Sequence, residues 1–466
     1  MRRQTKTPMS SPPLDQKSAI RRARRLVAEM FWGLADSSWT VAVRARRGLD
    51  RSLGWGRGLP AALVEAVRNL PDQAADFALG GALKIFEIRW PIVTLASLAG
   101  ATAIAGQWPP VQDAVEGVPP KPVRLALTIH PAAKPTPPVL KPGPAKLQQT
   151  LDALAENFGE TVGIAIVDTS SNWIVDVRGD MAFPQQSVSK LWVALTTLDA
   201  VDRGVVALDQ QVVLTEADRS VFNQPISYRI TPDGFPTTVA DLLKRALIES
   251  DNAANDKLMG MAGGPGAVRR LMNDKGLAGI SLAEDERHLQ AHIAGLTWSP
   301  DLAPYGAFNT ARARLPQSTR EAALDAYLTH PYDGAQPKAL AIALAQLQAG
   351  KLLSSGSTRW MVETMAKART GPSRLKGGLP AGWHIAHKTG TGQDYRGASI
   401  GINDVGLITA PDGKTYAVAV FLQRTRRPVS ERLAFLQSVS RAIVAQWERE
   451  SDQDPVSKAK ESMVAD

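Results

Sequence analysis

The sequence predicts a mixed α/β domain over residues 145–449, because helical and strand-like patterns alternate along this stretch. Apolar residues recur at helical spacing over 191–201 and again over 239–248. Three short runs rich in Val, Ile and aromatic residues, TVGIAIVDT, NWIVDVRG and TYAVAVFLQ, are typical of strands. These observations predict the class but not the arrangement of the strands.

Turns and end helices complete this prediction. The first two strand-like runs are expected to form a hairpin around 170–172, and PDGK at Pro411–Lys414 is expected to be the hairpin turn before TYAVAVFLQ. Helices are predicted at both ends of the domain, over 144–158 and 430–448.

Three short strings indicate the chemistry of the domain. SVSK at Ser187–Lys190, SDN at Ser250–Asn252 and KTG at Lys388–Gly390 occur in this order, as in acyl-transfer serine enzymes. Ser-x-x-Lys also occurs at 373–376 and 457–460, without the partner strings in that order. Order and context therefore select Ser187.

The context of Ser187 suits a nucleophile. It opens an apolar periodic run that reads as a buried helix, with Lys190 one turn later on the same side. A serine hydroxyl needs an adjacent base, and Lys190 is the candidate that the sequence places near it. For a lone motif, an N-cap serine beside a solvated lysine is the alternative.

The other two strings also have plain structural alternatives. SDN follows an apolar helix, where Ser, Asp and Asn commonly form a turn or cap. KTG lies in the alternating run WHIAHKTGTG, which predicts a strand whose free N–H groups supply half an oxyanion hole. Lys388 would hold a substrate carboxylate there.

Residues from about 145 to 449 resemble a class A β-lactamase. Beyond the three strings, EDERHLQ places Glu286, Leu289 and Gln290 where the family has Glu-x-x-Leu-Asn, with Gln in place of Asn. The run FPQQSV and the segment 392–403 resemble the family's extended-spectrum branch. The resemblance implies a five-stranded antiparallel sheet flanked by terminal helices and joined to an all-helical lobe, with the active site between them.

The resemblance also implies roles for the site residues. Ser187 is the nucleophile, Lys190 or a water held by Glu286 is the base, and Ser250 relays a proton to the leaving nitrogen. The backbone N–H groups of Ser187 and Thr391 form the oxyanion hole. The residues expected to bind substrate or orient water are Asn252, Gln290, Lys388, Thr389, Gly390, Thr391 and, as a rough counterpart of the family's carboxylate-binding arginine, Arg396.

One segment departs from the family pattern. Glu286 and Lys388 are 102 residues apart, which is longer than the family usually has, and the surplus lies in 299–337. A loop of this length is commonly functional or mobile, so a lid or an exposed insertion is expected.

Other functions remain open at this stage. A peptidoglycan D,D-peptidase, or a penicillin sensor that is acylated once, would share the three strings. His288 and His292 have the spacing of two metal ligands on a helix, but a solvated pair is expected because no third ligand is evident. His387 is expected to pack under the sheet. We expect no metal, no cofactor and a monomeric catalytic domain.

The N-terminal third of the chain contains features that indicate where in the cell the protein is located. Residues 1–89 carry 16 Lys and Arg against 8 Asp and Glu, which accounts for most of the net charge of +9. Two amphipathic runs in this basic arm suit an anionic membrane surface, with nucleic-acid binding around Arg21–Arg25 as the rival interpretation. The uncharged run 90–108, flanked by tryptophans, is predicted to be a transmembrane signal anchor with its N-terminal side cytoplasmic.

Alternatives for 90–108 are a buried soluble helix, or a signal peptide cleaved near Ala105 if the start codon is assigned too far upstream. The proline-rich residues 109–144 are predicted to be an extended linker, and 450–466 a disordered tail. Together these features predict a catalytic domain held in the periplasm at the inner membrane, with no nucleic-acid partner.

Overall fold

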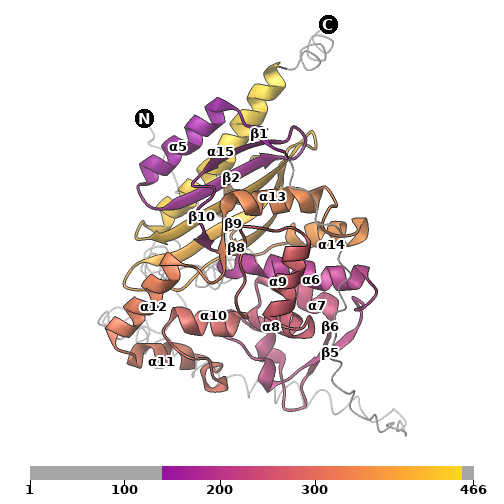
Figure 1. The fold of residues 1–466 in the computed structure, drawn as a ribbon, viewed down its shortest axis with the longest axis vertical. Helices are drawn as coiled ribbons and strands as arrows, with labels where there is room; N and C mark the ends of the chain where they lie inside the picture. The colour runs from indigo at the N-terminus through magenta and orange to yellow at the C-terminus, as the bar shows by residue number, and fades with distance from the viewer. Residues whose placement is uncertain (1–138, 454–466) are drawn as a thin grey trace, which may run out of the picture. The chain divides into compact units, whose positions relative to one another are not determined.

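A six-stranded sheet forms one half of the structure, a computed structural model that describes residues 139–453 (Figure 1). The strand order is β1-β3-β2-β10-β9-β8. The strands are β1 (Lys141–Pro142), β2 (Val162–Asp168), β3 (Trp173–Val177), β8 (His384–Gly390), β9 (Ser399–Thr409) and β10 (Thr415–Thr425). Five of them are antiparallel, which confirms the predicted sheet, and the two-residue β1 adds a parallel pairing to β3.

Each face of this sheet is buried by a different layer, as the alternation of side chains along β10 shows. Tyr416, Val418 and Val420 pack with α5 (Ala145–Phe158) and α15 (Val429–Gln453). Ala417 and Ala419 face the opposite way, toward the core of the helical lobe. Because successive side chains of a strand point to opposite faces, the apolar run TYAVAVF can serve two cores at once.

The helical lobe lies beyond the second face of the sheet (Figure 1). Its helices are α6 (Lys190–Asp202), α7 (Val239–Lys244), α8 (Asn252–Met261), α9 (Pro265–Asp274), α10 (Glu286–Ile293), α11 (Ala307–Arg314), α12 (Gln317–Thr329), α13 (Pro337–Gln348) and α14 (Ser355–Met365). Two small antiparallel strand pairs complete the lobe: β4 (Phe183–Pro184) with β7 (Gly334–Ala335), and β5 (Gln211–Leu214) with β6 (Phe235–Thr238). Helix α6 is buried along nearly its whole length and forms the centre of this core.

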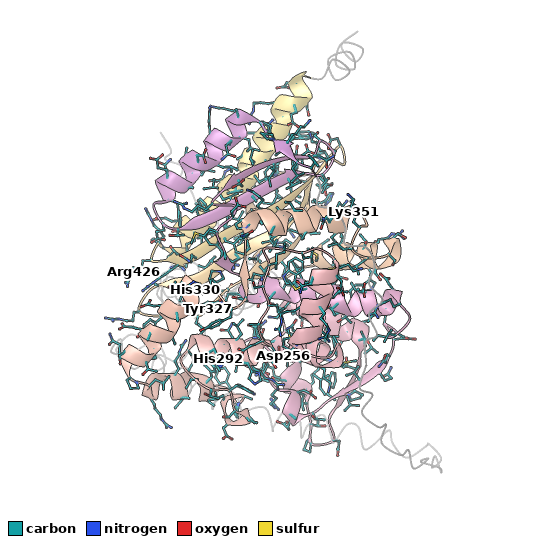
Figure 2. All side chains as sticks on the ribbon, viewed as in Figure 1. Asp256, His292, Tyr327, His330, Lys351 and Arg426 are labelled. Carbon is teal, nitrogen blue, oxygen red and sulfur yellow. The ribbon has the colours of Figure 1, made fainter. Side chains whose placement is uncertain are left out.

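The segment 299–337 folds into regular structure. A 3₁₀ turn at Pro300–Leu302 leads into α11 and α12, and the segment returns through β7 to the start of α13. Tyr327 of α12, labelled in Figure 2, is fully buried. The insertion therefore contributes to the interior as well as to the surface.

The basic arm 1–89, the predicted anchor 90–108, most of the linker and most of the tail lie outside the described residues, so those predictions stand untested. Within 139–453, no helix combines the length and apolarity needed to cross a bilayer.

Candidate active site

Ser187 lies in a 3₁₀ turn, Gln186–Ser189, that leads directly into α6. Asn403 of β9 fixes this turn by donating from Nδ2 to Pro184 O at 2.7 Å and to Gln185 O at 3.0 Å. Lys190 is the first residue of α6 and is fully buried. Its Nζ donates to Ser187 Oγ at 2.8 Å, the contact that the spacing of SVSK predicts.

Glu286 forms a second contact with Lys190. Lys190 Nζ donates to Glu286 Oε2 at 2.6 Å, and both side chains are almost completely buried. Glu286 begins α10, where Asp285 caps the helix by accepting from His288 N at 3.0 Å. A buried ion pair is tolerated only when its hydrogen-bonding groups are well satisfied, and the capped helix start holds Glu286 in that position.

The carboxyl group of Asp256 accepts a hydrogen bond from the backbone at the start of α10. Asp256 of α8 accepts from Glu286 N at 2.9 Å and from the Ser220 hydroxyl at 2.7 Å. Its burial, together with the nearby charges of Asp285 and Glu286, raises the pKa of Asp256 to about 7.

Ser250 occupies a left-handed backbone position between two helices. A single π-helical turn at Arg245–Glu249 ends α7, and Ser250 follows with φ of +60°. Lys388 Nζ donates to Ser250 Oγ at 2.8 Å. Burial, followed by the charge of nearby Lys190, lowers the pKa of Lys388 well below its ordinary value.

The other two residues of SDN differ in role: Asp251 caps a helix, and Asn252 carries a carbonyl oxygen without a hydrogen-bond partner in the described part of the chain. Asp251 caps α8 by accepting from Ala254 N at 2.9 Å, which is the structural alternative expected for this string. Asn252 Nδ2 donates to Val221 O at 2.7 Å, while its buried Oδ1 has no hydrogen-bond partner among residues 139–453. A buried acceptor without a partner is costly, so it points toward a ligand.

The KTG string lies on β8, the edge strand of the sheet. Thr389 Oγ1 donates to Thr370 Oγ1 at 2.7 Å. Gly390 is required for packing rather than for ligand access, because a Cβ there would lie 2.4 Å from Gln185 O. The missing side chain lets β8 pass directly beside the turn that carries Ser187.

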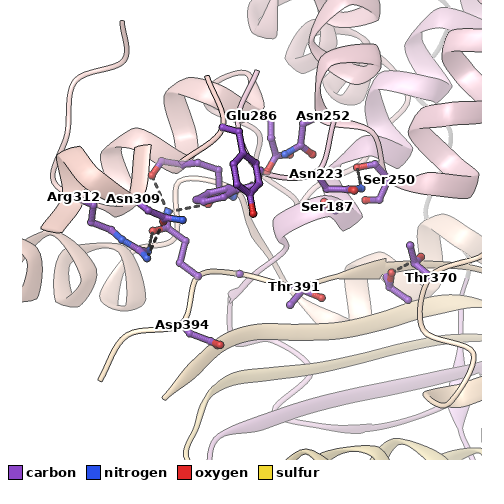
Figure 3. A pocket seen from close by; sticks show the side chains of 16 residues that line it. Ser187, Asn223, Ser250, Asn252, Glu286, Asn309, Arg312, Thr370, Thr391 and Asp394 are labelled. Carbon is purple, nitrogen blue, oxygen red and sulfur yellow. Dashed lines mark hydrogen bonds between the residues drawn. The ribbon is translucent and has the colours of Figure 1, made fainter. Parts of the chain in front are cut away.

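These elements enclose a cleft of about 600 Å³. Figure 3 shows Ser187 and Ser250 on one side of it, with Thr391, the residue after β8, below them. The predicted site residues that line the cleft are Ser187, Ser250, Asn252, Glu286, Gln290, Thr389 and Thr391. Lys190 and Lys388 lie behind the two serines that they contact.

Arg396 is the predicted site residue that the structure places elsewhere. It does not line the cleft, and its guanidinium donates to Glu321 Oε1 at 2.6 Å on the surface. Arg374, which the sequence did not single out, is buried and reaches the end of β8: it donates to Gly390 O at 2.9 Å and to Thr391 Oγ1 at 2.7 Å. A lone arginine in a loop carries no local pattern, so only tertiary contacts reveal it.

The insertion also supplies part of the cleft, which the sequence did not predict in residue terms. Tyr305, Asn309 and Arg312 line the cleft, and the last two lie on the opposite side of it from Ser187 (Figure 3). Arg312 donates to Gln393 Oε1 at 2.6 Å, and Gln393 in turn contacts Gln290. The segment predicted as a lid or exposed insertion therefore contacts the site directly.

The three histidines that the sequence analysis considered have structural partners. His288 Nδ1 pairs with Asp285, and His292 Nδ1 lies 3.0 Å from Glu284 Oε2. His387 is buried under the sheet with its Nδ1 2.8 Å from Asp404 Oδ1, as expected for that strand position. The described part of the chain contains no cluster of three or more residues suited to a metal ion.

Comparison with known proteins assigns this geometry to a family. A profile described as "Beta-lactamase enzyme family" matches residues 146–447. The extended-spectrum β-lactamase PER-1 of Pseudomonas aeruginosa is 30% identical over 283 residues, covering 59% of this chain and 79% of the relative. β-Lactamase VEB-1, also of Pseudomonas aeruginosa, is 27% identical over 266 residues, covering 57% of this chain and 78% of the relative.

Solved structures agree in fold. An ancestral class A β-lactamase has a TM-score of 0.51 at 28% identity, covering 64% of this chain and 99% of the other. A β-lactamase from Chitinophaga pinensis has a TM-score of 0.53 at 25% identity, with coverages of 64% and 98%. The family match over 146–447 spans the helical lobe and the sheet from β2 onward.

Proposed function

Because the chain belongs to the β-lactamase enzyme family, we propose that it is a class A serine hydrolase that opens β-lactam rings through a covalent acyl-enzyme on Ser187. One observation carries this proposal. Lys190 Nζ contacts both Ser187 Oγ and Glu286 Oε2, so a nucleophile, a cation and a carboxylate form one buried network at the edge of the cleft. Such a network can move the proton of a serine hydroxyl, which is the requirement for nucleophilic attack at neutral pH.

In acylation, Ser187 Oγ forms a bond to the lactam carbonyl carbon and the ring C–N bond breaks. In one route Lys190 first gives a proton to Glu286, and its neutral amine then takes the Ser187 proton; in the other, a water passes the Ser187 proton to Glu286. Ser250 gives its proton to the leaving nitrogen and is reprotonated from the base that took the Ser187 proton. Which base serves first stays open, since one lysine contacts both groups. The backbone N–H groups of Ser187 and Thr391 would stabilise the oxyanion.

In deacylation, water attacks the ester carbon, the bond from carbon to Ser187 Oγ breaks, and Glu286 accepts the water proton that finally returns to the serine. Gln290 supports this role, because its Nε2 donates to Glu286 Oε1 at 2.9 Å and its side chain also lines the cleft. A carboxylate that is held in this way contributes roughly 10²- to 10⁴-fold as a general base.

Substrate recognition follows from the cleft walls. The open Oδ1 of Asn252 would accept an N–H from the acylamide side chain of the substrate. Thr389 and Thr391, with the positive charge of Lys388 behind them, would hold its carboxylate. Arg374, and not Arg396, contacts this position, because it donates to Thr391 Oγ1.

Turnover tests the proposal. The purified chain should hydrolyse many equivalents of a chromogenic cephalosporin. Release of one equivalent followed by a stable adduct would overturn the hydrolase assignment in favour of a sensor. Release of D-alanine from a D-alanyl-D-alanine peptide without cephalosporin turnover would instead favour a D,D-peptidase.

We also propose that residues 90–108 anchor the catalytic domain at the periplasmic face of the inner membrane. The uncharged run between two tryptophans and the positive charge of residues 1–89 support this location. The same charge supports contact of the arm with anionic lipids. A monomeric catalytic domain is part of this proposal.

A further inference from the structure

A continuous chain of side-chain hydrogen bonds runs from the wall of the cleft into the buried interior, and both of its ends belong to the insertion. Its members, in order, are Arg312, Gln393, Gln290, Gln186, Tyr327 and Asp333. Gln290, in the middle, is the member that contacts Glu286, at 2.9 Å. The insertion is therefore connected to the proposed general base through amide groups alone.

The first end fixes the direction of these bonds. An amide offers an oxygen and an NH₂ group of nearly the same shape, so its orientation depends on its partners. Arg312 has only donors, and its Nη1 lies 2.6 Å from Gln393 Oε1. Gln393 must then turn its Nε2 toward Gln290, where it donates to the backbone O at 2.8 Å and to Oε1 at 2.9 Å.

The second end selects the same direction. Tyr327 donates its hydroxyl proton to Asp333 Oδ1 at 2.8 Å, so the phenol oxygen accepts from Gln186 Nε2 at 2.6 Å. Gln186 Oε1 then faces Gln290 and accepts from its Nε2 at 2.8 Å. Gln290 Oε1 therefore accepts from Gln393, and Gln290 Nε2 donates to Gln186. In this orientation the same Nε2 group also donates to Glu286.

We propose that Arg312 of the insertion is a positioning residue for deacylation: through Gln393 it orients the Gln290 amide so that an N–H group, not the carbonyl oxygen, faces the Glu286 carboxylate. This inference rests on the proposed function, because it concerns the step that Glu286 serves. A reversed Gln290 would set its carbonyl oxygen against Glu286 and displace the carboxylate from the attacking water. A misplacement of about 1 Å at a reacting group can cost on the order of 10²-fold in rate.

A simpler role for Arg312 would be to tether the insertion, and Gln393→Glu separates the two roles. The introduced carboxylate still accepts from Arg312, so a tether is kept or strengthened. It has no proton to donate to Gln290, however. The Gln290 amide must then either turn its NH₂ toward the new carboxylate and its oxygen toward Glu286, or keep the orientation that Gln186 selects, with its Oε1 set against the new carboxylate. Orientation by Arg312 therefore predicts a defect, whereas tethering alone predicts none.

The measurement is the decay of the acyl-enzyme, followed by intact mass after mixing with a penicillin. We expect Gln393→Glu to acylate within a few-fold of wild type and to deacylate about 10²-fold more slowly. Arg312→Lys retains a donor-only head group and should keep most of the wild-type decay rate. Arg314→Gln, which removes an exposed arginine from the same helix, should match wild type.

Each outcome decides between the alternatives. Wild-type decay in Gln393→Glu, or equal losses in Gln393→Glu and Arg312→Lys, would overturn the positioning role while leaving the hydrolase assignment in place. If Gln393→Glu does not fold, Arg312→Glu makes the same test, because an acceptor-only group demands the reverse orientation of Gln393. A wild-type chain that neither turns over a β-lactam nor forms an adduct would overturn the proposed function itself.

Discussion

Lys190 Nζ lies 2.6 Å from Glu286 Oε2, although the two residues are 96 positions apart in the sequence. The contact joins the start of α6 to the start of α10, so the geometry of the site depends on how two separate helices begin. Both helix starts are held by hydrogen bonds: Asn403, from the distant strand β9, fixes the turn before α6, and Asp285 caps α10 locally. The network is consequently preorganised before any substrate arrives.

Replacement of the nucleophile gives the first prediction. Ser187→Ala should abolish covalent labelling by a fluorescent penicillin, because the contact from Lys190 then ends at a methyl group. The matched control is Ser373→Ala, which alters the Ser-x-x-Lys string near Arg374 and should leave labelling intact. Labelling retained by Ser187→Ala would place the nucleophile elsewhere.

Glu286→Gln should separate the two halves of the reaction. The amide cannot accept the proton of the attacking water, so turnover of a chromogenic cephalosporin should fall by roughly 10²- to 10⁴-fold. A burst of product and a long-lived adduct, seen by intact mass, are expected. Normal steady-state turnover in this variant would contradict the assignment of Glu286 as the water activator.

The sequence predicted the fold class and the separate parts of the site because both depend on local patterns. Periodicity revealed the strands and helices, and SVSK, SDN and KTG each place a reactive group on one element. Two details escaped prediction. The two-residue β1 lies in a proline-rich stretch that reads as a linker, and the helix expected over 239–248 ends in a π turn that sets Ser250 in its left-handed position.

The chain of amides could not be predicted because it depends on pairings between distant polar residues. Arg312 and Gln393 are 81 positions apart, and Gln186 and Tyr327 are 141 apart. Arginine, glutamine and tyrosine are common surface residues with no periodic signature, so their sequence gives no indication that they meet. The sequence suggested Arg396 only as a rough counterpart of the family's arginine, and it gave no indication of the buried Arg374.

The proposed topology predicts a protease result. Protease added to spheroplasts should digest the catalytic domain while a tag on the N-terminus stays protected, because the basic arm is expected to remain cytoplasmic. Release of the catalytic domain by osmotic shock alone would instead support cleavage near Ala105.

Gly390→Ala should impair both stability and acylation. The added methyl group would lie 2.4 Å from Gln185 O and 3.3 Å from Val188 Cγ2, so β8 and the nucleophile turn must separate. Overpacking of this kind costs about 1–3 kcal/mol, measurable by denaturant unfolding. Gly260→Ala is the control, since a Cβ on that residue of α8 meets nothing within 4 Å. Equal stability of the two variants would contradict the close approach at Gly390.

Asp256 predicts a pH dependence of stability. Its pKa is about 7 in the folded chain against an ordinary value of 3.8, so between these values the folded state holds a proton that the unfolded state has lost. The free energy of unfolding therefore falls as pH rises through this window, and the loss is complete above about pH 7. Asp256→Asn removes the titration and keeps an oxygen that can accept from Glu286 N.

The melting temperature of Asp256→Asn should therefore exceed that of wild type at pH 8, by roughly 2–4 °C for each kcal/mol recovered. The difference should shrink toward pH 5, where wild type holds its buried carboxyl in the neutral form. Asp209→Asn, which replaces an exposed carboxylate, should show no such convergence. A difference that is constant from pH 5 to pH 8 would mean that the amide acts through hydrogen bonding to Ser220 and Glu286, and not through the charge of Asp256.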